Sequence, residues 1–365
     1  MTLDGYLAEC EGYFMAYKLT SPATISELQD LLSRLPGPDE SAAAAARARE
    51  LKLTKPQGAL GRLEDIAEWM SSWQGQHPPR TENIQVRVFA ANHGVVKHGV
   101  SAFPPEVTAQ MVANFKAGGA AVNQLAIDAN AELSVVAFDL NLPSSDFTEE
   151  PSLDEERFMR AIQKGMKSVP SRASLLCIGE MGIGNTTSAA AICLGLFGGQ
   201  PTDWTGRGTG IDNIALAKKT KIIETAVKTR LKKNAGGLEI LRCLGGLELV
   251  AMAGAVLAAR IKRIPVLLDG FVAGAAVAPL HVVQQGSLDH CMAAHVSAEP
   301  GHRRLLKKIH KQPLLDLGLR LGEASGATLA IPLLRAACAC HNGMATFTEA
   351  AVSGRKTTTE EKRKR

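Results

Sequence analysis

The sequence is short of aromatic residues and has no strong excess of one charge. Of its 365 residues only 3 are Trp, 3 are Tyr and 10 are Phe, whereas 34 are Gly. Few aromatics and many small residues fit a layered helix–sheet enzyme better than a β-sandwich. The formal net charge is +5, and residues 355–365 hold six basic and two acidic side chains, or +4 of that total. The nearly neutral remainder excludes the basic face of a nucleic-acid-binding protein.

Signals for export or membrane insertion are also lacking. The seven cysteines include no CxxC pair, which favours reduced thiols over a disulfide framework or a zinc ribbon. Asp4, Glu9 and Glu11 interrupt the stretch where a signal or transit peptide would lie. The uncharged run 270–288 contains Pro279 and several polar residues, so we expect a buried helix there. These features predict a cytoplasmic protein that binds neither nucleic acid nor membrane.

Common catalytic motifs are missing as well. The sequence has no HExxH, no GxSxG and no zinc-deaminase signature, which argues against zinc proteases, α/β-hydrolases and zinc deaminases. It has no GxGxxG, so a dinucleotide-dependent dehydrogenase is a poor match. No lysine follows the glycines of its glycine-rich loops in the manner of a P-loop.

Short apolar runs typical of strands alternate with helical patterns through the middle of the chain. The strand candidates are 86–91, 133–138, 175–178 and 264–268. The helical patterns cover about 105–127, 155–168, 186–197, 213–233, 246–262 and 271–284. This alternation predicts an α/β fold, with right-handed crossovers and a mostly parallel sheet flanked by helices.

The two ends of the chain are expected to differ from this middle part. We interpret 1–18 as an extension and 19–80 as N-terminal helices of a small helical domain. Residues 81–300 form the α/β ligand-binding domain. Residues 301–350 are expected to contain only helices, which join the small domain. The charged stretch 351–365 is expected to be disordered.

The most informative loop follows the third strand candidate, because ligands of an open parallel sheet bind beyond the carboxyl ends of its strands. Residues 179–187 read GEMGIGNTT and precede an Ala-rich helix. Glycines let backbone N–H groups approach a ligand, and a helix N-terminus favours a negative group. A carboxylate at Glu180 would repel phosphate and suits a cationic or proton-donating part of a ligand. A simple helix cap is an equally open interpretation.

Other candidates are weaker when taken singly. The glycine-rich run 206–210 precedes a helix with three lysines in its first half, Lys218, Lys219 and Lys221, which indicates an anion site or a solvated face. Glu323, in LGEASGA, is either a helix N-terminal acid or, if a cleft buries it, a general base with a raised pKa. His93 follows the first strand and is a site candidate. Other histidines are expected to be structural or on the surface: His98, His295 and His341.

Seven long motifs occur in one order over roughly residues 20–350. They are KPQGALGRLE (55–64), NHGVVKHGVSAFPPEVT (92–108), GEMGIGNTTSAAA (179–191), LGGLELVAMAG (244–254), LLDGFVAGAA (267–276), HVSAEPGHR (295–303) and RLGEASGATLAIPLLRAA (320–337). Taken together, they resemble the nicotinate-nucleotide–dimethylbenzimidazole phosphoribosyltransferase family.

The resemblance implies a homodimer whose subunit has a Rossmann-like sheet and a small helical domain. It implies transfer of phosphoribosyl from nicotinate mononucleotide to 5,6-dimethylbenzimidazole, without a metal or another cofactor. The products are nicotinate and α-ribazole 5′-phosphate, which supplies the lower ligand of cobalamin.

The resemblance also assigns roles to single residues. The general base falls on Glu323 and a supporting carboxylate on Glu180. Contacts to the donor and its phosphate fall on Gly182, Gly184, Gly206, Gly208, Gly210, Lys219 and Ser297. The base pocket falls on Phe103, Met111, Met181 and His93. The chain departs from the family at Asn92, where the family usually has Asp.

Two alternatives stay open. One is an enzyme of the same fold with a different acceptor, such as adenine or a phenolic. The other is a non-catalytic homologue that binds benzimidazoles or their ribosides. An apolar aromatic and two thioethers offer no side-chain hydrogen bond to the amino group of adenine, so Phe103, Met111 and Met181 predict a preference for dimethylbenzimidazole.

Overall fold

A six-stranded parallel sheet forms the centre of the molecule in the computed structural model, which describes residues 21–354. The strand order is β2-β1-β3-β4-β5-β6. The strands are β1 (Ile84–Ala90), β2 (Glu132–Ala137), β3 (Leu175–Met181), β4 (Val266–Leu268), β5 (Cys291–His295) and β6 (Pro313–Leu315). Every pairing is parallel, so all carboxyl ends meet at one edge of the sheet. The predicted α/β class with a parallel sheet is confirmed.

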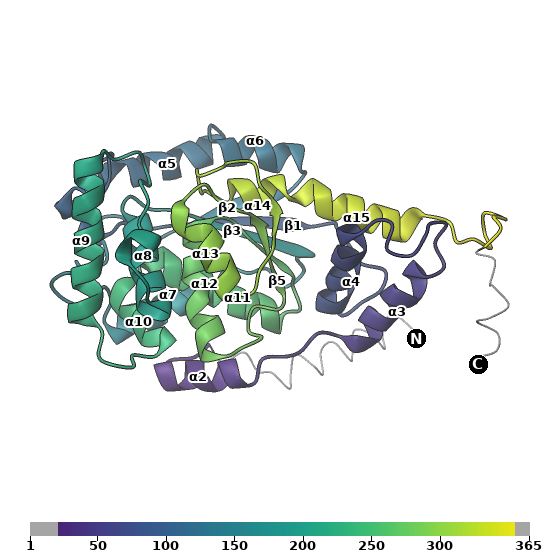
Figure 1. Cartoon of the computed structure of the whole chain (residues 1–365), viewed down its shortest axis with the longest axis horizontal. Coiled ribbons are helices and arrows are strands. Elements are labelled where there is room, and N and C mark those ends of the chain that lie inside the picture. The colour runs from purple at the N-terminus through teal and green to yellow at the C-terminus, as the bar shows by residue number, and fades with distance from the viewer. Residues whose placement is uncertain (1–20, 355–365) are drawn as a thin grey trace.

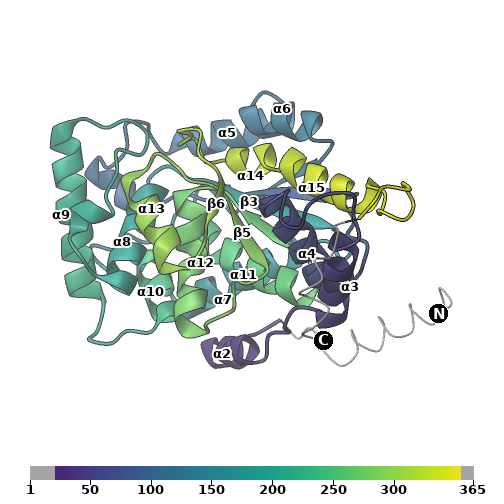
Figure 2. The ribbon, with the colours of Figure 1, turned by 45° about the vertical axis from the view of Figure 1, so that its right-hand side comes forward.

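Helices cover both faces of the sheet, as Figures 1 and 2 show. One face carries α7 (Glu155–Lys167), α8 (Asn185–Phe197), α10 (Gly237–Leu244), α11 (Leu247–Ile261), α12 (Phe271–Val283) and α13 (Pro300–Lys308). The other face carries α5 (Glu106–Ala117), α6 (Ala121–Asp128), α14 (Ser325–Leu329) and α15 (Ile331–Gly343). The outermost helix is α9 (Asn213–Arg230), which packs on α8 and α10.

Alternate side chains of the central strand β3 enter the two cores. Leu176 and Ile178 pack into the core beneath α7, α11 and α12, while Leu175 and Cys177 pack into the core beneath α14 and α15. The period of two along a strand explains this division. Both faces are apolar because both are covered, as expected for a parallel sheet.

The N- and C-terminal helices meet beside the sheet. Here α3 (Glu40–Glu50) packs on α4 (Arg62–Gln74), and α4 packs on α15. The guanidinium of Arg49 donates to the carbonyl oxygens of His341 and Asn342, at 2.6 and 2.8 Å. The first described helix, α2 (Ile25–Ser33), lies apart from this group, because Leu28 and Leu32 enter the core beneath α12.

Several sequence-based predictions need correction. The prediction of only helices after residue 300 is wrong, because β6 extends the sheet beside β5. Strand β5 and helix α10 were not predicted. The expected helix over 105–127 breaks at Gly118, which has a left-handed φ of 82° and ends α5. No helix within residues 21–354 is long and apolar enough to cross a membrane. The expected extension 1–18 and the tail beyond residue 354 lie outside the described residues.

Candidate active site

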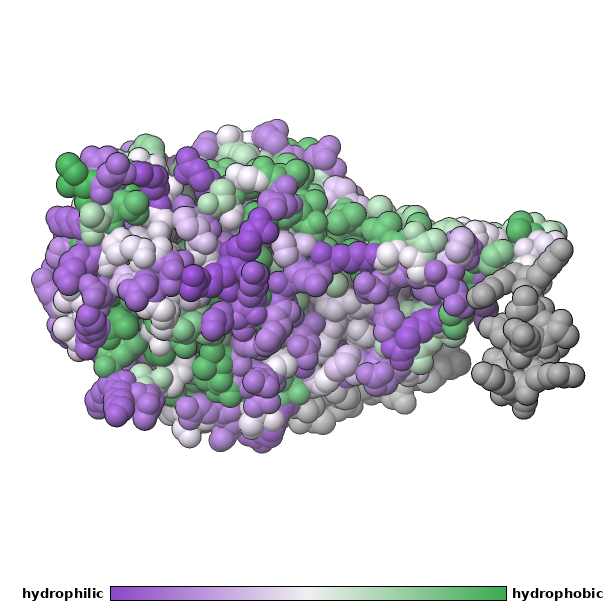
Figure 3. All heavy atoms as spheres, in the orientation of Figure 1, coloured by the Kyte–Doolittle hydropathy of each residue, from purple (hydrophilic) through white to green (hydrophobic). Residues whose placement is uncertain are grey.

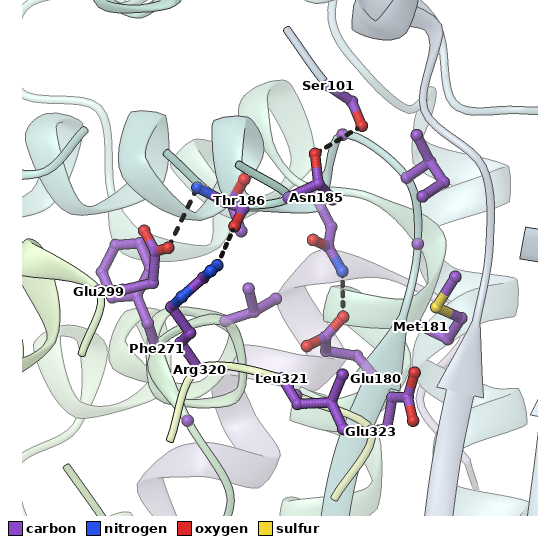
Figure 4. Close-up of a pocket in the computed structure, with 18 of the residues that line it drawn as sticks. Ser101, Glu180, Met181, Asn185, Thr186, Phe271, Glu299, Arg320, Leu321 and Glu323 are labelled. Carbon is purple, nitrogen blue, oxygen red and sulfur yellow. Dashed lines mark hydrogen bonds between the residues drawn. The ribbon is translucent and has the colours of Figure 1, made fainter. Parts of the chain in front are cut away.

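A cavity of about 440 Å³ opens at the carboxyl edge of the sheet. The loops that follow β1, β3, β4 and β5 supply its walls, together with the loop 320–323 before α14. This is the position at which open parallel sheets bind ligands. Figure 4 shows how side chains from these separate loops converge.

The cavity brings together most of the residues that the sequence predicted. Those that line it are Phe103, Met111, Glu180, Met181, Gly182, Gly184, Gly208, Ser297 and Glu323. Four predicted residues do not line it: His93, Gly206, Gly210 and Lys219. The first group comes from segments far apart in sequence, which the fold brings to one cavity.

Glu180 is a buried carboxyl at the end of β3. Its Oε2 accepts a hydrogen bond from Nδ2 of Asn185, and a side chain at Gly322 would come within 2.5 Å of its Oε1. Burial, the charges of Glu248 and Asp269 and, to a smaller extent, that of Glu323 raise the pKa of Glu180 well above its usual range. The raised pKa favours the protonated form of Glu180, in which the carboxyl can donate a hydrogen bond to a ligand.

Glu323 lies on the turn before α14, beside Glu180 (Figure 4). Its backbone N–H donates to the carbonyl oxygen of Glu180 at 3.0 Å. Both Glu323 and Ala324 have left-handed φ values, 62° and 59°. Burial, followed by the charge of Asp269, raises the pKa of Glu323 to about 7. A carboxylate with this pKa can accept a proton at neutral pH.

The glycine-rich loop 206–210 lies between basic and acidic side chains. Nζ of the fully buried Lys219 donates to Oγ1 of Thr186 at 2.8 Å and to the carbonyl oxygen of Gly206 at 3.1 Å. Burial lowers the pKa of Lys219 to about 8, against an opposing effect of Glu299. Arg320 donates to the carbonyl oxygen of Gly208 at 2.9 Å.

This arrangement suits an anion. Lys219 supports the cavity wall from behind through Thr186, and Arg320 lines the cavity itself. The positive N-terminal end of α8 begins at Gly184, which has a left-handed φ of 94°. Glu299 accepts from the backbone N–H of Gly208 at 3.1 Å and holds this loop. Sequence reasoning missed Thr186, Glu299 and Arg320 as individual residues, although all three lie within or beside glycine-containing motifs.

The opposite part of the cavity is apolar. Phe103, Met111 and Met181 line it, together with Val107 and Ile183. The segment that carries Phe103 is tied to the glycine-rich loop, because Oγ1 of Thr209 accepts from the backbone N–H of Ala102 at 3.0 Å and lies 3.1 Å from Oγ of Ser101. A flat apolar ring fits such a wall.

The structure places His93 behind the cavity and not in its base pocket. Its Nε2 lies 2.5 Å from Oε1 of Glu248, and its Nδ1 lies 3.1 Å from Oγ of Ser188. All three side chains are buried, and none lines the cavity. Ser188, His93 and Glu248 are hydrogen-bonded in the manner of a catalytic triad. Ser188 cannot act as a nucleophile, however, because a substrate in the cavity does not reach it.

Asn92 also has a structural position. Its Nδ2 donates to the carbonyl oxygen of Leu140 at 2.9 Å and so ties the loops after β1 and β2 together. Within residues 21–354, no group of three or more His, Cys, Asp or Glu side chains is placed to hold a metal ion. Asp269 lies at the end of β4. His295, which was expected to be structural or on the surface, lies at the end of β5 and lines the cavity.

Comparisons with known proteins agree with this geometry. A family model described as phosphoribosyltransferase matches residues 35–352. A relative from Ruegeria sp. (strain TM1040), named nicotinate-nucleotide–dimethylbenzimidazole phosphoribosyltransferase, is 56% identical over 90% of this chain and 98% of its own. A relative of the same name from Jannaschia sp. (strain CCS1) is 54% identical over 92% of this chain and 100% of its own.

A solved structure is also similar. It is the enzyme of that name from Thermus thermophilus, which is 40% identical, with a TM-score of 0.80 over 87% of this chain and 100% of the other. The fold is thus that of a phosphoribosyltransferase. The chain belongs to the nicotinate-nucleotide–dimethylbenzimidazole phosphoribosyltransferase family.

Proposed function

We propose that this protein transfers the phosphoribosyl group of nicotinate mononucleotide to 5,6-dimethylbenzimidazole. The observation that supports this most strongly is the position of Glu323, a buried carboxyl with a pKa of about 7 in a cavity that is apolar at one end and basic at the other. An apolar acceptor with a dissociable N–H fits the first end, and the phosphate of the donor fits the second.

The reaction requires little acid catalysis and one base. The pyridinium of the donor is already cationic, so the bond between ribose C1′ and the ring nitrogen breaks with both electrons leaving on neutral pyridine nitrogen. A nitrogen of the acceptor forms the new bond to C1′ from the opposite face, which converts a β into an α linkage. The other acceptor nitrogen then gives its proton to Glu323. Glu180, whose burial favours the protonated form, can donate a hydrogen bond in the same part of the cavity.

The donor is held by its phosphate. Lys219 and Arg320 supply positive charge around the loop 206–210, and the start of α8 supplies backbone N–H groups. Ser297 lines the same wall. Binding energy at the phosphate can then be used to align C1′ with the acceptor nitrogen.

The test is incubation of the purified full chain with nicotinate mononucleotide and a panel of bases. Nicotinate release that depends on dimethylbenzimidazole, with formation of α-ribazole 5′-phosphate, is the expected result. Release that depends only on adenine or a phenolic would assign a different acceptor. Binding of benzimidazoles without release of nicotinate would establish a non-catalytic homologue and overturn the proposal.

We also propose that the protein is a cytoplasmic homodimer. The outer face of α15 presents exposed small apolar residues, including Pro332, Ala336 and Ala339. Figure 3 shows hydrophobic surface along this helix. A second copy would cover it. The six cysteines within residues 21–354 are free thiols, which a reducing compartment preserves. Sedimentation equilibrium gives the mass of the assembly, and a monomer would contradict the proposed dimer.

A further inference from the structure

Asp269 lies directly behind the wall of the cavity, at the end of β4. Its side chain is only 1% exposed, and it does not line the cavity, although the next residue, Gly270, does. Its backbone N–H donates to the carbonyl oxygen of Ile178 at 3.2 Å, which continues the pairing of β4 with β3. The carboxyl group is therefore held by the sheet itself and not by a mobile loop.

One oxygen of this carboxylate anchors α14, the helix that directly follows the turn of Glu323, and so holds that turn. Oδ1 of Asp269 accepts a hydrogen bond from the backbone N–H of Ala327 at 2.9 Å, in α14. That turn contains two consecutive non-glycine residues in the left-handed region, Glu323 and Ala324, a conformation that the surroundings must maintain. The turn also lies flat on β3, because a side chain at Gly179 would come within 2.1 Å of the backbone nitrogen of Ala324.

The other oxygen is unpaired. Oδ2 of Asp269 has no hydrogen-bond partner among residues 21–354. The basic group nearest to the carboxylate is His295, whose Nε2 lies 3.6 Å from Oδ1, and neither ring nitrogen of His295 has a hydrogen-bond partner in the described chain. Burying a carboxylate oxygen without a hydrogen bond destabilises the folded state. If Asp269 only had to accept the hydrogen bond from Ala327, a neutral side chain with an oxygen would do so at a lower free-energy cost.

We propose that Asp269 is a positioning residue, which holds the Glu323 turn in place and sets a buried negative charge behind it. The role in turnover rests on the proposed function, whereas the electrostatic effect on Glu323 does not. Asp269 itself does not line the cavity, whereas its neighbours Gly270 and His295 do.

The electrostatics agree with this geometry. Burial, followed by the charge of Asp269, raises the pKa of Glu323, since a neighbouring negative charge disfavours a second carboxylate. Removing the Asp269 charge must therefore lower the pKa of Glu323. The other titratable or charged groups around the two carboxyls are Glu180 and Cys177 on β3, Glu248 on α11, His295 on β5, and Arg320 on the loop of Glu323 itself.

Two neutral replacements separate the charge from the tether. Asp269→Asn removes the charge and keeps an oxygen that can accept from Ala327, whereas Asp269→Ser removes the charge with a side chain that is one bond shorter. Either variant suffices if the other fails to fold. The acid limb of kcat/KM should move to lower pH by roughly one unit in both, because one like charge is removed. Protonation of the acceptor base also affects kcat/KM at low pH, but it is the same in every variant. The test is therefore the difference in the pH of the acid limb between each variant and the parent protein.

A matched control is Asp146→Asn. Asp146 is also buried, but Nζ of Lys97 lies 3.0 Å from it and it does not line the cavity. The acid limb should stay where it is in this variant. Asp269→Asn and Asp269→Ser could instead lose the same fraction of the rate at every pH, with the acid limb of kcat/KM at the same pH as in the parent protein. That result would show that Asp269 has only a structural role and would overturn the proposal.

A titration that needs no turnover makes the result independent of the proposed reaction. Glutamate labelled with carbon-13 at the side-chain carboxyl reports the protonation of Glu323 by NMR, and Glu323→Gln identifies its signal. The midpoint should be lower in Asp269→Asn than in the parent protein. An unchanged midpoint overturns the proposal even if the enzyme is active, and a shifted midpoint supports it even if dimethylbenzimidazole is not the acceptor.

Discussion

Nε2 of His93, after the end of β1, lies 2.5 Å from Oε1 of Glu248 on the first turn of α11. Both side chains are buried, and the pair lies beneath the glycine loop 182–184, since a side chain at Gly182 would come within 2.9 Å of Oε1 of Glu248. Glu248 in turn helps to raise the pKa of Glu180 in the cavity. The pair therefore supports the site from behind.

This position predicts a loss of stability when the pair is broken. His93→Gln should lower the free energy of unfolding by about 1–3 kcal/mol, because it leaves a buried carboxylate with a poorer partner. His98→Gln is the matched control, since His98 also contacts a carboxylate but is partly exposed, and its loss should stay below about 1 kcal/mol. Urea denaturation followed by circular dichroism measures both. Unchanged stability of His93→Gln, with a raised KM for the acceptor, would instead return His93 to the base pocket.

Glu323→Gln should reduce turnover by at least about 100-fold while both substrates still bind, because the amide keeps the shape but cannot take up the acceptor's proton. In the parent protein, kcat/KM should fall as the pH drops below about 7, where Glu323 becomes protonated. Glu156→Gln, on the exposed surface of α7, serves as the control. Nicotinate release is the measurement, and a near-normal rate for Glu323→Gln would remove Glu323 as the base.

Lys219→Ala should raise the KM for nicotinate mononucleotide much more than the KM for its dephosphorylated nucleoside, because only the former has a phosphate to bind. Burial lowers the pKa of Lys219 to about 8, so its charge is present below that pH and lost above it. The KM for the mononucleotide should therefore also rise above about pH 8. Lys218→Ala is the control on the exposed side of the same helix. Equal losses for nucleotide and nucleoside would show that Lys219 has no role at the phosphate.

Dimethylbenzimidazole should be preferred over adenine as the acceptor. Phe103, Met111 and Met181 line the apolar part of the cavity and offer no strong hydrogen bond to an amino group. The two bases compete for one limiting donor, and chromatography resolves the two ribotide products. Met181→Gln adds a hydrogen-bonding side chain at the same place and should shift the product ratio towards adenine. A parent protein that selects adenine would contradict the assignment of the base pocket.

Much of the fold could be predicted because its signals are local. Buried strands that alternate with helices require a parallel sheet, and the cap of α2 is visible as Thr24 followed by Glu27. Strands β5 and β6 were missed because they contain no β-branched or aromatic residue: β5 consists of Cys, Met, Ala and His, and β6 of Pro and Leu. Such residues form a strand only when neighbouring strands supply the hydrogen bonds.

The amino-acid sequence alone determined the chemistry that is available at the carboxyl edge of the sheet: glycine loops, Glu180 at a strand end and Glu323 between glycines. Only the tertiary structure decided which side chains face the cavity and which lie behind it. His93 and Lys219 occupy strand-end and helix positions that the sequence made plausible, yet long-range packing turns both into the interior, towards Glu248 and Thr186. The raised pKa of Glu323 likewise depends on burial and on the charge of Asp269, 54 residues earlier in the sequence, because proton affinity is set by the surroundings in space.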